Sequence, residues 1–405
     1  MQKSSVLRLA CAVSVMFGTL LARASSPETV LYAFRAAPGA CPEGGLVFDE
    51  IGNLYGSTEG CGNSNPTIFE MSRGEDGTWS LITLFEDLMG GTSNVVLDSS
   101  GNLYGTSYGA GDQGIGAVFE LVKGSNGQWT ENILYSFGSY PGDGTRPRAG
   151  VVFDSKGNVY GTTTEGGTYG IGTAFELMPN GQGGWSESLL YSFTGGADGS
   201  APSSGLTIGS AGRLYGTTSL GGLKNTGTVF EITPTLDGWI QNVIHSFGDR
   251  IDGQNPMGGV TFDTFGNLYG TTFDGGSIGF GTVFELTPTG GDWSEAIIHR
   301  FNPASGDGTN PSAPITIDST GTLYGVTPSG GAYGSGTAFR LTADSNGKWV
   351  KSGQYNFSGR TDGGLPTGSL TLDQFGDIFG ATISGGIGGC AGYSDGCGVI
   401  FEIKQ

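Results

Sequence analysis

Five aspartates recur at the same place in a repeating pattern, each followed by glycine and, four residues after the aspartate, by proline. They are Asp143, Asp198, Asp252, Asp307 and Asp362, and the prolines are Pro147, Pro202, Pro256, Pro311 and Pro366. Carboxylate oxygens gathered on one face are the ligands that a hard cation such as Ca²⁺ takes, so these aspartates are the candidate ligand or cation site. The same residues also suit tight turns, in which an aspartate accepts hydrogen bonds from nearby backbone, and their regular repetition favours that interpretation.

The aspartates belong to a longer repeat. Seven sequence motifs resemble Gly-Asn-Leu-Tyr-Gly. They begin at Gly52, Gly101, Gly157, Gly212, Gly266, Gly321 and Gly376, at spacings of 49, 56, 55, 54, 55 and 55 residues. A period of this size is typical of propellers and solenoids. In the third repeat, four runs have the character of strands, at 150–154, 158–163, 173–177 and 185–193. Four antiparallel strands make one propeller blade.

The two ends of the chain supply complementary parts of one repeat. The seventh repeat stops after its third strand, 399–403, while residues 29–34 match a fourth strand that has no blade of its own. Pairing these two segments closes a ring and leaves no open sheet edge. We therefore predict an all-β fold, a seven-bladed β-propeller of four-stranded antiparallel blades, in which the N-terminal strand completes the last blade.

Residues 1–24 have the layout of a secretory signal peptide, with basic residues, an apolar run from Leu9 to Leu21 and small residues near Ala24. We expect cleavage there, one propeller domain over 25–405, a secreted or periplasmic location, and no membrane span after cleavage. The formal net charge of −19 disfavours nucleic acid and anionic membranes as partners. We expect a monomer.

Four cysteines lie outside this N-terminal segment, at Cys41, Cys61, Cys390 and Cys397. An oxidising compartment favours disulfides. We expect the pairs Cys41–Cys61 and Cys390–Cys397, although four cysteines allow three pairings and blades one and seven are neighbours. A redox role is disfavoured, because the last two cysteines lack the spacing of a CxxC motif.

The repeat unit at 190–234, LYSFTGGADGSAPSSGLTIGSAGRLYGTTSLGGLKNTGTVFEITP, resembles the GloVer (Gloeo/Verruco) tandem-repeat family of secreted bacterial proteins. The words GNLYGTT and GTVFEL recur in order, with variations, over essentially the whole mature chain. The resemblance implies a propeller and says almost nothing about activity.

Loops that depart from the repeat are where a specialised site is expected. Two connections between repeats, 36–44 and 86–94, lack the Asp-Gly-Pro pattern. Basic and aromatic loop residues on the same face suit a sugar polymer, which they would bind by hydrogen bonding and stacking, with ordinary loop decoration as the alternative. They are Arg146, Arg148, Lys224, Arg250, Arg360, Tyr108, Tyr140, Tyr169 and Tyr333.

Two classes of function stay open. The first is a noncatalytic binding or scaffold propeller for an extracellular polysaccharide or surface protein, with no cofactor expected. The second is a Ca²⁺-dependent propeller hydrolase or lactonase, which requires unequal polar residues around the central tunnel. The first strands of the repeats are apolar and alike, as in Gly-Leu-Val-Phe and Gly-Val-Thr-Phe, which favours binding. His245 and His299 occupy the position of a tyrosine in the fourth strand. We interpret both histidines as packing residues.

Overall fold

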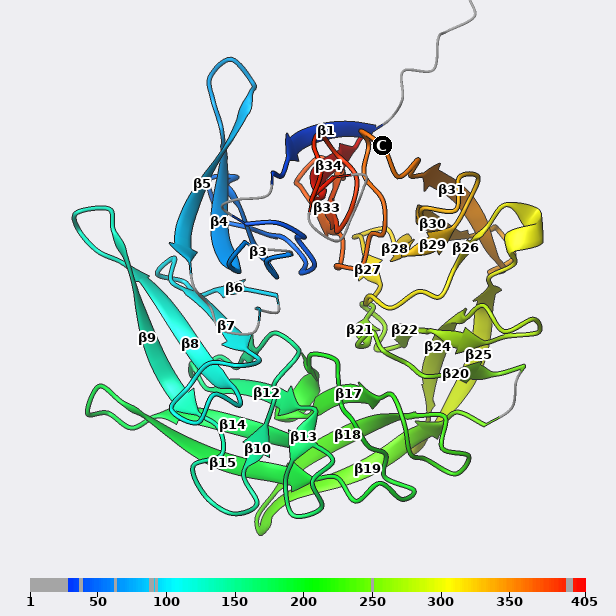
Figure 1. The fold of residues 1–405 in the computed structure, drawn as a ribbon. Coiled ribbons are helices and arrows are strands. Elements are labelled where there is room, and N and C mark those ends of the chain that lie inside the picture. Colours follow the sequence, from blue (N-terminus) through cyan, green and yellow to red (C-terminus); the bar gives the residue numbers. More distant parts are fainter. Residues whose placement is uncertain are drawn as a thin grey trace, which may run out of the picture.

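The computed structural model describes residues 28–35, 39–61, 64–86, 91, 94–248, 251–390 and 396–405. Its regular structure is β, with two short 3₁₀ turns, η1 (Ser210–Gly212) and η2 (Pro303–Ser305). Seven four-stranded antiparallel sheets surround a central axis (Figure 1), which confirms the predicted seven-bladed propeller. None of the described residues forms a helix long and apolar enough to cross a membrane.

Six blades are built from strands that follow one another along the chain. Blade 1 contains β2 (Val47–Phe48), β3 (Leu54–Thr58), β4 (Thr67–Arg73) and β5 (Trp79–Glu86); blade 2 contains β6 (Val96–Leu97), β7 (Leu103–Ser107), β8 (Ala117–Lys123) and β9 (Trp129–Ser136). Blade 3 contains β11 (Val152–Phe153), β12 (Val159–Thr163), β14 (Thr173–Pro179) and β15 (Trp185–Ser192); blade 4 contains β16 (Thr207–Ile208), β17 (Leu214–Thr218), β18 (Thr228–Thr235) and β19 (Gly238–Ser246). Blade 5 contains β21 (Thr261–Phe262), β22 (Leu268–Thr272), β24 (Thr282–Thr289) and β25 (Asp292–Arg300); blade 6 contains β27 (Thr316–Ile317), β28 (Leu323–Thr327), β30 (Thr337–Ala343) and β31 (Trp349–Asn356).

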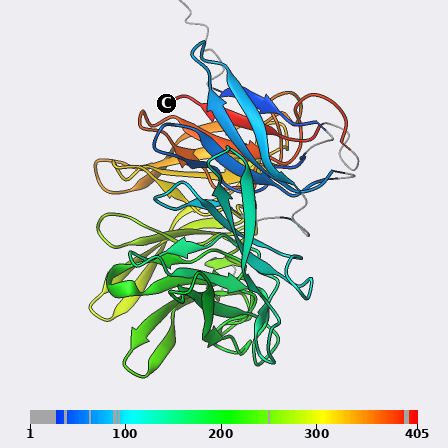
Figure 2. The same ribbon diagram turned by 90° about the vertical axis from the view of Figure 1, so that its left-hand side faces the viewer.

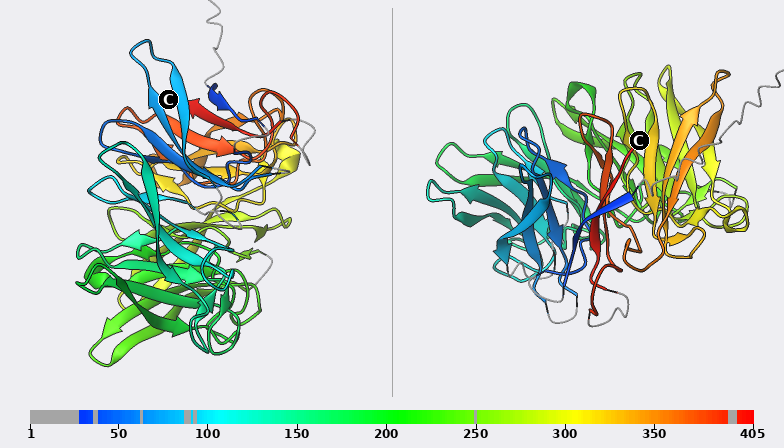
Figure 3. Two further views of the ribbon diagram at one scale, coloured as in Figure 1. Left: turned by 60° about the vertical axis from the view of Figure 1, so that its left-hand side comes forward. Right: turned by 90° about the horizontal axis from the view of Figure 1, so that it is seen from above.

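Blade 7 joins the two ends of the chain. It contains β32 (Thr371–Leu372), β33 (Ile378–Thr382), β34 (Val399–Ile403) and β1 (Glu28–Ala33). Strand β1 runs antiparallel to β34, from Glu28 opposite Ile403 to Ala33 opposite Val399. Figures 2 and 3 show the ring from further directions, with β1 dark blue and β34 red. The predicted closure by the N-terminal strand is confirmed, and the predicted signal peptide lies outside the described residues.

A glycine in the second strand of each blade makes room for a phenylalanine from the third. Gly161 on β12 pairs with Phe175 on β14, and a Cβ atom at Gly161 would lie 2.5 Å from the Phe175 ring. The same glycine–phenylalanine pair recurs in all seven blades. The repeated glycine is therefore a packing requirement within the blade.

The hydrophobic core is divided among the boundaries between blades, and each boundary has its own cluster. Phe193, just after β15 of blade 3, packs edge-on against Phe230 of blade 4, with ring centroids 5.1 Å apart. Equivalent pairs are Phe34–Phe69, Phe137–Phe175, Phe247–Phe284, Phe301–Phe339 and Phe357–Phe401. Aromatic burial between neighbouring blades thus holds the ring together.

Two disulfides stand where blade 7 meets blade 1. They join Cys41 to Cys61 and Cys390 to Cys397, which confirms the predicted pairing. The amide of Cys41 donates a hydrogen bond to the carbonyl of Cys397, with N···O 2.9 Å, and all four cysteines belong to or pack on one hydrophobic cluster. The loops on each side of the boundary between blades 7 and 1 therefore carry a disulfide.

Candidate functional site

Two kinds of loop share one face of the propeller. Connecting loops lead from the fourth strand of one blade to the first strand of the next, and glycine loops join the second and third strands of a blade. In blade 3 the two loops pair as β10 (Gly144–Thr145) with β13 (Glu165–Gly166). Blades 5 and 6 pair in the same way, as β20 (Gly253–Gln254) with β23 (Asp274–Gly275) and β26 (Gly308–Thr309) with β29 (Ser329–Gly330). The connecting loops and glycine loops of these blades therefore lie on the same face.

A cavity of about 590 Å³ forms a channel on the axis of the ring, lined by residues at or just before the first strand of every blade. Most of these residues are small, among them Gly150, Gly205, Gly259, Ala313 and Ser369. Short side chains let seven strands approach one axis. The volume falls within the range of about 300–1,000 Å³ that is usual for small-ligand sites.

The mouth of this channel carries two carboxyl groups from blade 1. Glu43 comes from the connecting loop that departs from the repeat, and Glu59 comes from the glycine loop. Burial raises the pKa of Glu43 to about 8, a hydrogen bond with Glu59 and the charge of that carboxylate also raise it, and the charge of Arg148 opposes them. At neutral pH Glu43 therefore keeps its proton, so the pair offers one donor and several acceptors.

Tyr108 of blade 2 and Arg148 of blade 3 line the next sector of the mouth, and Arg146 of blade 3 lies beside them. The guanidinium carbons of Arg146 and Arg148 each lie 4.7 Å from the centre of the Tyr108 ring. Arg146 also pairs with Glu165, at N···O 3.2 Å. Cation–π contact fixes the planar guanidinium groups. Both arginines lie against the Tyr108 ring, where the sequence analysis expected a sugar to stack. This sector therefore offers hydrogen-bond donors from guanidinium groups to a ligand.

Further polar and apolar groups reach the channel from blades 4 and 5. The hydroxyl of Ser203 is buried and has no hydrogen-bond partner among the described residues. Met257 is exposed and adds a flexible apolar side chain. Glu43, Glu59 and Arg148 lie together at this mouth. The mouth can therefore both donate hydrogen bonds to a polar ligand and accept them from it.

The structure places each of the five predicted aspartates in a separate connecting loop. Asp198 accepts hydrogen bonds from the Tyr191 hydroxyl, with O···O 3.0 Å, and from the Thr194 amide, with N···O 2.7 Å. Asp143 and Asp362 have the same two kinds of donor, and a histidine stands in place of the tyrosine beside Asp252 and Asp307. Each carboxylate is thus engaged within its own turn.

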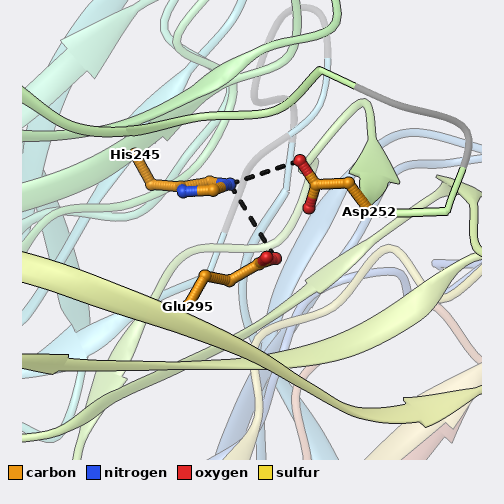
Figure 4. A group of neighbouring side chains, drawn as sticks. All are labelled: His245, Asp252 and Glu295. Atoms are coloured by element: carbon orange, nitrogen blue, oxygen red, sulfur yellow. Dashed lines mark ion pairs between the residues drawn. The ribbon is translucent and has the colours of Figure 1, made fainter.

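A side chain from the next blade completes each of these groups, which we call the rim clusters. The five clusters are Tyr135–Asp143–Glu187, Tyr191–Asp198–Gln241, His245–Asp252–Glu295, His299–Asp307–Lys351 and Tyr355–Asp362–Glu28. Burial is the largest cause that raises the pKa of Glu28 and Glu187 to about 7 and that of Glu295 to about 8. Figure 4 shows the cluster of His245, in which the imidazole faces both carboxylates.

Sequence reasoning missed the third member of each rim cluster and the two carboxyls of the channel mouth. In blades 3 to 6 the third member stands two residues after the tryptophan of the outer strand, as Glu187 follows Trp185, so a regular signal existed. Glu43 lies within the flagged 36–44 loop, and Asn94, from the flagged 86–94 loop, also lines the channel.

The remaining flagged loop residues are scattered. Tyr169 and Tyr333 are exposed and do not line the channel, and Tyr140 donates a hydrogen bond to Glu187, with O···O 2.9 Å. Lys224 and Arg360 also lie away from the channel lining. Arg250 and residues 36–38, 87–90 and 92–93 of the two flagged loops lie outside the described residues.

Several solved structures resemble this fold. A catalytically inactive variant of virginiamycin B lyase from Staphylococcus aureus, solved with quinupristin, is 16% identical, with 93% of this chain and 99% of that chain covered and a TM-score of 0.57. A protein from Lactobacillus plantarum is 14% identical, with 77% and 84% covered and a TM-score of 0.52. At these identities the likeness shows the fold alone. A comparison with curated proteins found no match.

The repeat itself is recognised by a family profile. The profile of the Gloeobacter/Verrucomicrobia repeat matches residues 63–259 and 208–405, which together span most of the chain. The match confirms the resemblance drawn from the repeated words GNLYGTT and GTVFEL. The chain belongs to the Gloeobacter/Verrucomicrobia repeat family.

Proposed function

We propose that the protein is a secreted, noncatalytic binding propeller that holds a neutral, hydroxyl-rich ligand, such as part of an extracellular polysaccharide, at the mouth of its central channel. The observation that carries this proposal is the carboxyl pair Glu43–Glu59 beside Arg148, in one sector of a channel otherwise lined mostly by small residues. A site for one ligand needs unequal residues from different blades, and this sector provides them.

The charge of the mouth supports a neutral ligand. Glu43 is protonated at neutral pH, the charges of Glu59 and Arg148 offset each other, and Arg146 is paired with Glu165. A saccharide offers hydroxyl groups that both donate and accept, which matches this mixture of carboxyl and guanidinium groups. Secretion is supported by the two disulfides, which are typical of oxidising compartments.

A glycan array tests the proposal. The wild-type protein and the double variant Glu43→Gln, Glu59→Gln are applied to the same array of neutral and acidic oligosaccharides. We expect the wild type to bind neutral glycans, and we expect the double variant to bind them at least tenfold more weakly, since it loses both carboxyl groups of the mouth. Asp198→Asn is the control, because its rim cluster lies outside the channel. An array without bound neutral glycans, or equal binding by the double variant, contradicts the proposal.

A second candidate function is favoured by the raised pKa of Glu43. A protonated carboxyl beside an ionised one is the arrangement of a general acid and a general base. In that case Glu43 donates a proton to the leaving group of an ester or lactone while Glu59 activates water. Two carboxylates beside an arginine offer fewer oxygens than the six to eight that Ca²⁺ takes, so this candidate rests on proton transfer more than on a bound cation.

Hydrolysis assays separate the two candidates. Wild type and Glu43→Gln are assayed on a panel of nitrophenyl esters and lactones between pH 5 and pH 10. An enzyme is expected to lose turnover above pH 8, as Glu43 loses its proton, and to lose at least a hundredfold in kcat in the variant. Absence of turnover by the wild type leaves the binding function as the account of this site.

A further inference from the structure

The rim cluster between blades 4 and 5 combines three metal-ligating side chains. His245 is on β19, Asp252 directly precedes β20 and Glu295 is on β25 (Figure 4). The Nε2 atom of His245 lies 3.5 Å from Oδ2 of Asp252 and 3.8 Å from Oε1 of Glu295. One ligand atom from each residue lies within 4.8 Å of the other two. The three side chains therefore converge on a single point.

The three side chains are largely buried, and one atom of each has no hydrogen-bond partner among the described residues. The three side chains are 19%, 18% and 17% exposed. Nε2 of His245, Oδ1 of Asp252 and Oε1 of Glu295 are buried and have no hydrogen-bond partner among the described residues. Buried polar atoms normally have hydrogen-bond partners. A cation between them would satisfy all three groups at once.

At the boundary between blades 5 and 6, the equivalent rim cluster contains a positively charged side chain of the protein. His299 and Asp307 occupy the positions of His245 and Asp252, and Lys351 occupies that of Glu295. Nε2 of His299 lies 3.2 Å from Oδ2 of Asp307, and the ammonium of Lys351 contacts the other oxygen of this carboxylate. A positive charge from the following blade therefore fits this position in the fold.

The other rim clusters satisfy their aspartates with tyrosine. Tyr191 donates to Asp198 with a neutral Gln241 beside them, and Tyr135 donates to Asp143 with O···O 2.8 Å. A phenol that donates a proton is a poor ligand for a divalent metal ion. Among the five rim clusters, the combination of an imidazole with two carboxylates occurs at blades 4 and 5.

We propose that His245, Asp252 and Glu295 bind a divalent transition-metal ion, Zn²⁺ in the first place, and that the ion links blades 4 and 5. Imidazole nitrogen and carboxylate oxygen are zinc ligands, whereas Ca²⁺ and Mg²⁺ prefer oxygen alone. Ligand atoms on a tetrahedral zinc ion lie about 3.4 Å apart for bonds of about 2.1 Å. The separations from Nε2 of His245, 3.5 Å to Oδ2 of Asp252 and 3.8 Å to Oε1 of Glu295, are close to this value, and the ligand atoms of the three residues all lie within 4.8 Å of one another.

The surroundings of the cluster are compatible with a bound metal. The amide of Gly248 donates a hydrogen bond to Oδ2 of Asp252, with N···O 3.0 Å, and Oδ1 has no partner among the described residues, so this carboxyl group can still offer an oxygen to the ion. Since β19 and β25 belong to different blades, binding selectively stabilises the closed ring.

Titration of the purified, chelator-treated protein with ZnCl₂ in a calorimeter tests the proposal. We expect one zinc ion per chain and a rise in the melting temperature that chelator reverses. His245→Tyr and Glu295→Gln install the residue types that the blade 3–4 boundary already accommodates, as Tyr191 and Gln241. Each is expected to fold and to weaken zinc binding at least tenfold. Replacement by Co²⁺ should give visible absorption bands that both variants lose.

Two further variants sharpen the test. Glu295→Lys copies the place of Lys351 and is expected to abolish zinc binding and its effect on melting, while His299→Tyr, in the neighbouring rim cluster, should leave zinc affinity unchanged. The proposal is overturned if the wild type does not bind zinc, if Glu295→Lys binds it as tightly as the wild type, or if His299→Tyr loses it. Tighter binding of Ca²⁺ than of Zn²⁺ would overturn the assigned class of metal.

Discussion

The rim clusters and the channel mouth lie in the same kinds of loop, yet the first are repeated around the ring and the second is not. At the rim, an aspartate such as Asp198 meets a tyrosine from its own blade and a side chain from the next. At the mouth, Glu43, Glu59 and Arg148 each occur once. In a closed ring, repeated residues stabilise every boundary between blades in the same way. A site for one ligand requires residues that differ from the repeat.

Removing a repeated aromatic should have the largest effect on the fold. Phe193→Ala deletes a fully buried ring that packs on Phe230 across a blade boundary. We expect the free energy of unfolding to fall by about 3–5 kcal/mol. Urea unfolding followed by tryptophan fluorescence measures it. An unchanged midpoint would mean that the boundaries do not carry the stability of the ring.

The seam between blades 7 and 1 should be the next most sensitive place. Cys41 and Cys61 are 20 residues apart in sequence, and their disulfide restricts the unfolded chain. Replacing both cysteines with serine is expected to lower the free energy of unfolding by about 2–4 kcal/mol. Thermal melting with and without reductant checks this result. If reductant destabilises the wild type no more than the variant, the seam does not depend on this bond.

A repeated rim aspartate should affect stability and leave binding unchanged. Asp198→Asn weakens the acceptor of Tyr191 and Thr194, so we expect a loss of about 1–3 kcal/mol in the free energy of unfolding. Glycan affinity should stay within twofold of the wild type. A large loss of glycan affinity with unchanged stability would indicate that the glycan binds at the rim clusters and not at the mouth.

The carboxyl pair at the mouth should make the stability of the protein depend on pH. The folded-state pKa of Glu43, about 8, exceeds its unfolded value of 4.5, so the folded state holds a proton that the unfolded state has lost, and stability falls as pH rises between these values. Glu43→Gln should remove part of that fall, on the order of 1–2 kcal/mol after allowance for partial exposure. Melting temperatures of both proteins between pH 5 and pH 9 provide the comparison. Parallel curves would contradict a shared proton at the mouth.

The strands and the ring closure could be predicted from the sequence because the repeat has a regular spacing, and the disulfides could be predicted because four cysteines allow only three pairings. The rim clusters are harder to predict, because their third member comes from the next blade. Lys351 reaches Asp307 from 44 residues away. The mouth is harder still, since Glu43, Tyr108 and Arg148 come from three connected blades and meet only through the curvature of the ring. The only sequence feature that pointed to Glu43 is the 36–44 loop, which lacks the Asp-Gly-Pro pattern.

The affinity of the best-bound neutral oligosaccharide for three proteins tests the central claim most directly. Calorimetric titration of the wild type, of Glu43→Gln with Glu59→Gln, and of Asp198→Asn compares the mouth with the rim under one set of conditions. The account predicts at least a tenfold loss for the mouth variant and no more than a twofold change for the rim variant. Equal affinities for the wild type and the mouth variant, or a larger loss in the rim variant, would contradict the assignment of function to the channel mouth.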